Sequence, residues 1–279
     1  MKKISRRSFL AAAGLSVAAL ALTACGGSSA STASSVASSA ASSEAASTSA
    51  AAGELTTVEA GKLTMATNAA FPPYEMTTDA GEFEGIDIET AQAIADKLGL
   101  ELQIDDMDFD AALLSVQQGK ADIVMAGVTV TDERKAVMDF SDSYATGIQS
   151  IIVPEGSDIA SPDDLAGKKI GTQRGTTGYI YCSDDFGDEN VVAYDDGLTA
   201  VQALNNGQVD AVVIDNAPAQ EFIAANPGLM ILDTSYAEED YAIGMAKGSA
   251  LEDAVNAALE ELKADGTLQS IVDKYITAE

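Results

Sequence analysis

Three polar features of the sequence could together bind a small zwitterion. The planar guanidinium of Arg134 is suited to two parallel hydrogen bonds with a carboxylate. The glycine-rich loop 175–178, which contains Thr176 and Thr177, could hold the same anion with its backbone N–H groups. The carboxylate of Asp215 could pair with an ammonium group. A carboxylate and an ammonium group are the two charges of a free amino acid.

Composition excludes several other kinds of chemistry. The sequence has no histidine, so Ser–His or Cys–His nucleophiles and histidine metal sites are absent. Cys182 is the only cysteine after Cys25, and we expect it to be a packed small residue rather than half of a disulfide. The formal net charge of −29 disfavours nucleic acid and anionic lipid, because both bind cationic surfaces. We therefore predict no metal, no cofactor and no nucleic acid partner.

The elements that must position these residues form an α/β pattern. Apolar runs alternate with helical periodicity along residues 54–279, which predicts mainly parallel sheets with helices on both faces. The predicted strands are 63–67, 101–105, 122–126, 148–153, 169–172, 191–194, 211–215 and 243–246. The predicted helices are 88–98, 109–118, 177–184, 198–206, 218–225, 251–264 and 268–275.

One helix–strand unit occurs twice. Asp108 precedes the first copy and Asp196 the second, and each copy continues through a helix to a glycine, Gly119 or Gly207, and then to an apolar strand. Aspartate before a helix and glycine after it are common helix boundaries. The repeat predicts two similar lobes, each built on a small doubly wound sheet.

The same repeat predicts where a ligand binds. In open α/β sheets, ligands lie beyond the carboxyl ends of the strands. Residues 127–129 follow the repeated strand of the first copy, and Asp215 ends the repeated strand of the second. We expect these two positions to meet in a cleft between the lobes.

Several short segments, taken in order, carry a family resemblance. They are 68–74 (NAAFPPY), 85–89 (GIDIE), 107–109 (MDF), 126–135 (AGVTVTDERK), 139–142 (DFSD), 175–177 (GTT) and 215–218 (DNAP). Over about residues 58–276 the chain resembles the polar amino acid solute-binding proteins of ABC importers, which have the type II periplasmic-binding-protein fold. The resemblance implies a monomeric binding protein, not an enzyme, that delivers a polar amino acid to a permease encoded elsewhere.

The resemblance also implies how the ligand's backbone is bound. Arg134 would bind the α-carboxylate together with the backbone N–H groups of Thr129 and Thr177. Asp215, the carbonyl of Gly127 and the hydroxyl of Thr129 would bind the α-ammonium.

The ligand's side chain would meet a second group of residues. By the same resemblance, Phe71 and Phe109 would clasp the side chain, and Gln173 could reach its far end. Asn68 stands where the family often has aspartate, which weakens the case for a basic ligand, although Asp87 could supply a carboxylate. Neutral polar, basic and cystine ligands all stay open.

Two other functions are compatible with the same fold. A lipid-anchored amino acid sensor would use the same cleft and dock on a signalling partner. A periplasmic dehydratase-like enzyme would need a general acid and base in the cleft, and carboxylates could serve.

The resemblance also suggests how the lobes move. We expect residues 58–145 and 243–279 to form the first lobe, and residues 146–242 the second. The chain would then cross between the lobes twice, which makes a hinge that can close over a ligand.

The N-terminal segment predicts export and anchoring. Residues 1–24 combine a basic start with the apolar stretch 9–22, as a signal peptide does. The stretch ends in a lipobox-like sequence before Cys25, whose thiol would be acylated, and the paired arginines leave the export pathway open. Residues 25–54 are mostly serine and alanine and predict a disordered tether. We therefore expect a protein held by lipid on the outer face of the cell membrane or in the periplasm.

Overall fold

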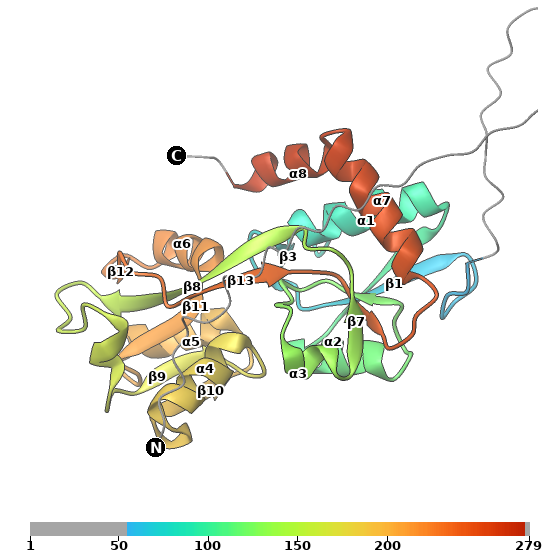
Figure 1. The fold of residues 1–279 in the computed structure, drawn as a ribbon. Coiled ribbons are helices and arrows are strands. Elements are labelled where there is room, and N and C mark those ends of the chain that lie inside the picture. Colours follow the sequence, from blue (N-terminus) through green and yellow to red (C-terminus); the bar gives the residue numbers. More distant parts are fainter. Residues whose placement is uncertain (1–54, 277–279) are drawn as a thin grey trace, which may run out of the picture. The chain divides into compact units, whose positions relative to one another are not determined.

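The computed structural model describes residues 55–276, in which helices flank two mixed β-sheets (Figure 1). The predictions for the signal peptide, for Cys25 and for the tether lie outside these residues. In the first sheet, β1 pairs in parallel with β5 and β6, whereas β14 runs antiparallel to β6 and β7. Its strands in spatial order are β5 (Glu101–Asp106), β1 (Lys62–Thr67), β6 (Ile123–Val124), β14 (Gly244–Ala246) and β7 (Met138–Phe140).

The second sheet has the same mixed character. Strand β9 runs parallel to β10 and β11, whereas β8 pairs antiparallel with β11, β12 and β13. Its strands are β10 (Val191–Tyr194), β9 (Ile170–Gln173), β11 (Ala211–Asp215), β8 (Ala145–Pro154) and β12 (Leu229–Ile231), with β13 (Ala237–Tyr241) beside β8. A small third sheet holds β2 (Ala70–Phe71), β3 (Glu75–Thr77) and β4 (Phe83–Glu84).

The prediction of mainly parallel sheets is wrong. Each large sheet contains three parallel strands, and antiparallel strands complete it. Three of the antiparallel strands have weak sequence signals, because β7 and β12 have only three residues each and β13 contains three acidic residues, which are disfavoured in strands. Pairing with the ten-residue strand β8 overrides this preference in β13.

All seven predicted helices are present, with ends within two residues of the prediction. The helices are α1 (Ile86–Leu98), α2 (Phe109–Gln117), α3 (Asp132–Lys135), α4 (Thr177–Phe186), α5 (Gly197–Asn205), α6 (Asn216–Ala225), α7 (Glu252–Ala264) and α8 (Thr267–Tyr275), with 3₁₀ turns at Pro162–Leu165 and Asp188–Asn190. The one-turn helix α3 was not predicted. Within residues 55–276, no helix is both long and apolar enough to cross a membrane.

The repeated unit is confirmed in detail. The glycine after each of the two helices has a φ of 66°, a left-handed conformation that favours glycine. Oδ2 of Asp122 accepts a hydrogen bond from the backbone of Thr64, and Oδ2 of Asp210 accepts one from Lys169, each at 2.8 Å. The two copies differ at the start, since only the aspartate before α5 caps its helix through the side chain. The matching bonds place the ends of β6 and β11 in equivalent positions of the two sheets.

Buried apolar side chains connect the two sheets. The largest cluster includes Leu63 of the first sheet and Val212 of the second, and it continues through Tyr144 and Tyr241 beside the connecting strands. Cys182 is fully buried in a separate cluster, as predicted.

Candidate functional site

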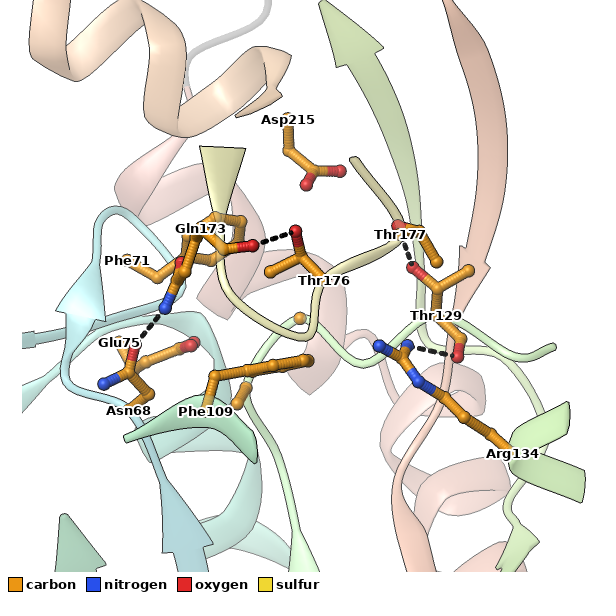
Figure 2. A pocket seen from close by; sticks show the side chains of 12 residues that line it. Asn68, Phe71, Glu75, Phe109, Thr129, Arg134, Gln173, Thr176, Thr177 and Asp215 are labelled. Atoms are coloured by element: carbon orange, nitrogen blue, oxygen red, sulfur yellow. Dashed lines mark hydrogen bonds between the residues drawn. The ribbon is translucent and has the colours of Figure 1, made fainter. Parts of the chain in front are cut away.

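All ten residues that the sequence predicted to bind ligand line a single cavity (Figure 2). They are Asn68, Phe71, Phe109, Gly127, Thr129, Arg134, Gln173, Thr176, Thr177 and Asp215, and the lining also includes Glu75 and Ala126. The cavity lies where the residues after β6 approach the end of β11, as the repeat predicted. Figure 2 shows Asn68, Phe71 and Glu75 toward one side of the cavity, with Arg134, Thr129 and Thr177 toward the other.

Arg134 is held rigidly at its side of the cavity. Thr131 caps the short helix α3, because its hydroxyl accepts a hydrogen bond from the Arg134 backbone at 3.1 Å. The guanidinium donates to the carbonyls of Thr129, at 2.8 Å, and Gly175, at 3.1 Å, and lies 5.3 Å from the ring centroid of Phe109. Burial lowers the pKa of Arg134, but a guanidinium stays charged in proteins. Its five N–H donors can bind these carbonyls and a carboxylate at the same time.

Asp215 supplies a buried carboxylate at the end of β11. Its Oδ2 accepts a hydrogen bond from Gln149 at 2.8 Å, and its Oδ1 accepts one from the hydroxyl of Tyr241. Burial is the main reason that the pKa of Asp215 rises to about 7, and repulsion from Glu239 adds to the rise. A positive group placed beside Asp215 would favour its ionised form.

Glu75 is a site residue that the sequence analysis missed. It begins β3, is fully buried and lines the cavity, yet neither of its carboxyl oxygens has a hydrogen-bond partner among the described residues. Burial raises the pKa of Glu75 well above its ordinary value, and the nearby carboxylate of Asp87 raises it further. Its position directly after the segment 68–74 was the available signal.

Asp87 does not line the cavity, although the sequence analysis considered it as a carboxylate for the ligand. It lies in the first turn of α1 and is fully buried, and its Oδ2 accepts a hydrogen bond from the backbone of Gly127 at 3.0 Å. A Cβ atom at Gly127 would lie 2.8 Å from the ring of Phe71, so this position requires glycine. Asp87 therefore holds the loop that forms the cavity wall.

An amide pair crosses the cavity at the side of Glu75. Nε2 of Gln173 donates to Oδ1 of Asn68 at 2.8 Å, and Nδ2 of Asn68 donates to the carbonyl of Met107 at 2.9 Å. Phe71 and Phe109 are both buried at this cavity. Polar amides and aromatic faces together suit a long side chain with a polar end.

Thr176 and Thr177 shape the start of α4. The hydroxyl of Thr176 accepts a hydrogen bond from Tyr179, and it also donates to the carbonyl of Gln173 at 2.8 Å. The side-chain oxygens of Thr177 and Thr129 lie 3.5 Å apart at the other side of the cavity. The start of this helix therefore faces the cavity beside Arg134, where a helix N-terminus favours an anion.

Comparison with known proteins decides the family. The sequence pattern of bacterial extracellular solute-binding proteins, family 3, matches residues 63–278. The chain belongs to this family. Among its relatives, the L-cystine-binding protein TcyJ of Escherichia coli (strain K12) is 33% identical over 226 residues, covering 79% of this chain and 85% of the relative. The arginine-binding extracellular protein ArtP of Bacillus subtilis (strain 168) is 33% identical over 228 residues, covering 78% and 87%.

Solved structures of the family share the fold. The arginine-, lysine-, histidine-binding protein ArtJ of Geobacillus stearothermophilus has a TM-score of 0.75 and 34% identity, covering 78% of this chain and 96% of ArtJ. An ancestral arginine-binding protein bound to glutamine has a TM-score of 0.75 and 41% identity, covering 78% and 99%. The fold is thus the two-lobed type II periplasmic-binding-protein fold that the sequence predicted. The family description makes this chain an extracellular solute-binding protein.

Proposed function

We propose that the protein binds an amino acid with a positively charged side chain in this cavity and delivers it to the permease. The observation that carries the proposal is Glu75, a fully buried carboxyl group that lines the cavity. Among the described residues its neighbour is another acid, Asp87, and no cationic side chain pairs with it. A free amino acid presents one carboxylate to Arg134 and one ammonium to Asp215. Those two pairs leave Glu75 unmatched, and a second positive charge on the ligand would match it.

The ligand would lie across the cavity from Arg134 to Glu75. Its α-carboxylate is bound by Arg134 and by the backbone N–H groups at Thr129 and Thr177, beside the start of α4. Its α-ammonium is bound by Asp215, by the carbonyl of Gly127 and by the hydroxyl of Thr129. The presence of all these residues in the lining of one cavity supports these roles.

The side chain of the ligand would then extend toward Glu75. Phe71 and Phe109 contact its apolar part, and Asn68 and Gln173 bind its polar end. Solved relatives named for arginine, lysine and histidine support a cationic end. The pair of amides also suits a neutral polar side chain, which is the second candidate.

Binding would close two lobes about a hinge. The proposed lobes are residues 58–145 with 243–279, and residues 146–242, so the chain crosses between them in β8 and near the end of β13. These strands pair along five positions (Figure 1). Two hydrogen bonds join the proposed lobes across the cavity: Gln173 donates to Asn68, and Arg134 donates to the carbonyl of Gly175. A ligand that contacts both lobes favours the closed state.

Export would end in lipid anchoring. We propose that residues 1–24 are a signal peptide, that Cys25 is lipidated and that residues 25–54 are the tether. The proposed mature protein is a monomer without enzymatic activity. The family description as extracellular supports export.

A ligand panel tests the proposed specificity. L-arginine, L-lysine, L-histidine, L-glutamine and L-cystine are compared by thermal shift and then by calorimetry. A ligand at 100 times its dissociation constant stabilises a protein by about 2.7 kcal/mol. We expect the largest shifts with L-arginine or L-lysine, whereas a shift with only L-glutamine or L-cystine would contradict the cationic ligand.

A further inference from the structure

Glu239 gathers groups from three separate segments behind the cavity. It lies on β13 with 7% of its surface exposed, whereas its neighbour Glu238 is exposed. Its Oε2 accepts hydrogen bonds from the hydroxyls of Thr129, at 3.1 Å, and Thr177, at 3.0 Å, and from Nε2 of Gln149, at 3.1 Å. Thr129 and Thr177 themselves line the cavity, and Figure 2 shows their side chains facing each other.

These bonds determine what the two hydroxyls can offer a ligand. A hydroxyl has one hydrogen to donate and two lone pairs that accept. Oε2 of Glu239 accepts from both hydroxyls, so Thr129 and Thr177 direct their hydrogens to Glu239 and away from the cavity. The hydroxyl of Thr177 also accepts a hydrogen bond from Nε2 of Gln149 at 3.4 Å. This leaves two lone pairs on Thr129 and one on Thr177 that can accept hydrogen bonds from a ligand.

The neighbouring amide follows the same rule. Nε2 of Gln149 donates to Glu239 and also to Oδ2 of Asp215 at 2.8 Å. Its two hydrogens are therefore directed to these two acidic side chains and to the hydroxyl of Thr177, and none is directed into the cavity. Around Asp215, this network presents only acceptors to the cavity, which suits an ammonium group and repels a second anion.

We propose that Glu239 is a positioning residue that orients the hydroxyls of Thr129 and Thr177 as acceptors for the α-ammonium of the ligand. A buried carboxylate is costly to a fold, and an apolar residue of similar size would often stabilise it. The three donors that converge on Glu239 account for its buried position better than a contribution to the stability of the fold does. The inference rests on the proposed function in one respect only, that the ligand is an amino acid with an α-ammonium group.

The test compares a ligand with its analogue that lacks the α-ammonium. L-arginine and 5-guanidinopentanoic acid are titrated by calorimetry into the wild type, Glu239→Met, Glu239→Gln and Glu238→Gln. Glu239→Met removes the acceptor at similar size, and we expect it to weaken L-arginine binding by about tenfold or more, as for a lost hydrogen bond to a charged group. Binding of the analogue should change by less than about twofold.

The other variants separate this role from a structural one. Glu239→Gln keeps an oxygen that can accept from the hydroxyls, and we expect it to recover a large part of the lost affinity for L-arginine. Glu238→Gln removes the same charge from the exposed face of β13 and should bind both compounds as the wild type does. If Glu239→Met weakens the binding of both compounds equally, the proposed role of Glu239 is wrong, whereas the proposed ligand still stands.

The proposed ligand can fail separately. If the wild type binds L-glutamine rather than L-arginine, the same comparison uses L-glutamine and 5-amino-5-oxopentanoic acid. A selective loss of the amino acid then supports Glu239, and an equal loss overturns it. A wild type that binds no amino acid would overturn the proposed function, and the role of Glu239 with it.

Discussion

Replacing Glu75 with glutamine should change ligand affinity and unliganded stability in opposite directions. Glu75→Gln keeps the size of the side chain but removes the charge that would pair with a cationic ligand. Truncating one partner of a buried charge pair typically costs about 2–5 kcal/mol, so L-arginine should bind about 30-fold to several thousandfold more weakly. Binding of L-glutamine should stay the same or improve, since an amide can accept its neutral end.

The unliganded protein should not lose stability. The pKa of Glu75 is raised well above its ordinary value by burial and by Asp87, so the folded protein holds a proton that the unfolded chain releases. Stability from this group is present below the unfolded pKa and is lost as pH rises toward the folded pKa. The glutamine side chain in Glu75→Gln has no proton to release, so the variant does not lose this stability as the pH rises. Its unfolding temperature at pH 7 should therefore equal or exceed that of the wild type.

Calorimetry and thermal unfolding measure the two effects. Binding of L-arginine should also release a proton from Glu75, which appears as a dependence of the binding enthalpy on the buffer and is reduced in Glu75→Gln. Glu84→Gln is the matched control, because Glu84 lies exposed on β4 of the same small sheet. An affinity of Glu75→Gln for L-arginine within about threefold of the wild type would refute the pairing. So would an equal loss of L-glutamine binding.

Four further outcomes are expected. Arg134→Ala should weaken amino acid binding by about 2–5 kcal/mol, and Arg134→Lys should lose much of the same binding energy, because lysine lacks the planar guanidinium. An affinity within about threefold of the wild type, measured by calorimetry, would contradict this role. Because the pKa of Asp215 is about 7 and an ammonium needs its ionised form, affinity should fall as pH drops below 7, and a flat titration from pH 5 to 8 opposes this. Cys25→Ser should prevent lipidation, and a processed variant still bound to membranes argues against the anchor. If the free protein is open, small-angle scattering should give a smaller radius of gyration when ligand is bound. An open free protein whose radius does not change on binding would contradict closure about the hinge.

The cavity was largely predictable because its main residues follow clear boundaries. Arg134 and Thr129 come after a repeated strand, Asp215 ends its equivalent, and the loop at Thr177 precedes a helix. Parallel strands bring such positions to one edge of a sheet. The repeat alone therefore predicts that the ends of two equivalent strands, one in each sheet, lie close together.

Glu75 and Glu239 could not be predicted in the same way. Acidic residues are rarely fully buried, so a glutamate in a short polar strand is ordinarily expected at the surface. Glu75 begins the three-residue strand β3, and Glu239 lies between two acidic neighbours in β13. Their burial depends on other segments of the chain, since Asp87 and Asp215 lie near Glu75 and β13 pairs with β8. Local sequence does not contain that information.

The buried acids also explain why ligand and closure belong together in the proposed mechanism. Asp215, Glu75 and Glu239 lie in or behind the cavity, and within residues 55–276 Arg134 is the only cationic side chain that lines it. Closing the cleft removes water, which strengthens repulsion among carboxylates as well as attraction to cations. Closure without a ligand therefore brings acidic groups together and disfavours their ionised forms. A cationic amino acid brings two positive groups and one negative group, so its contacts favour the closed state more than the open one. A neutral ligand brings no net charge, and it would close the same cleft less strongly.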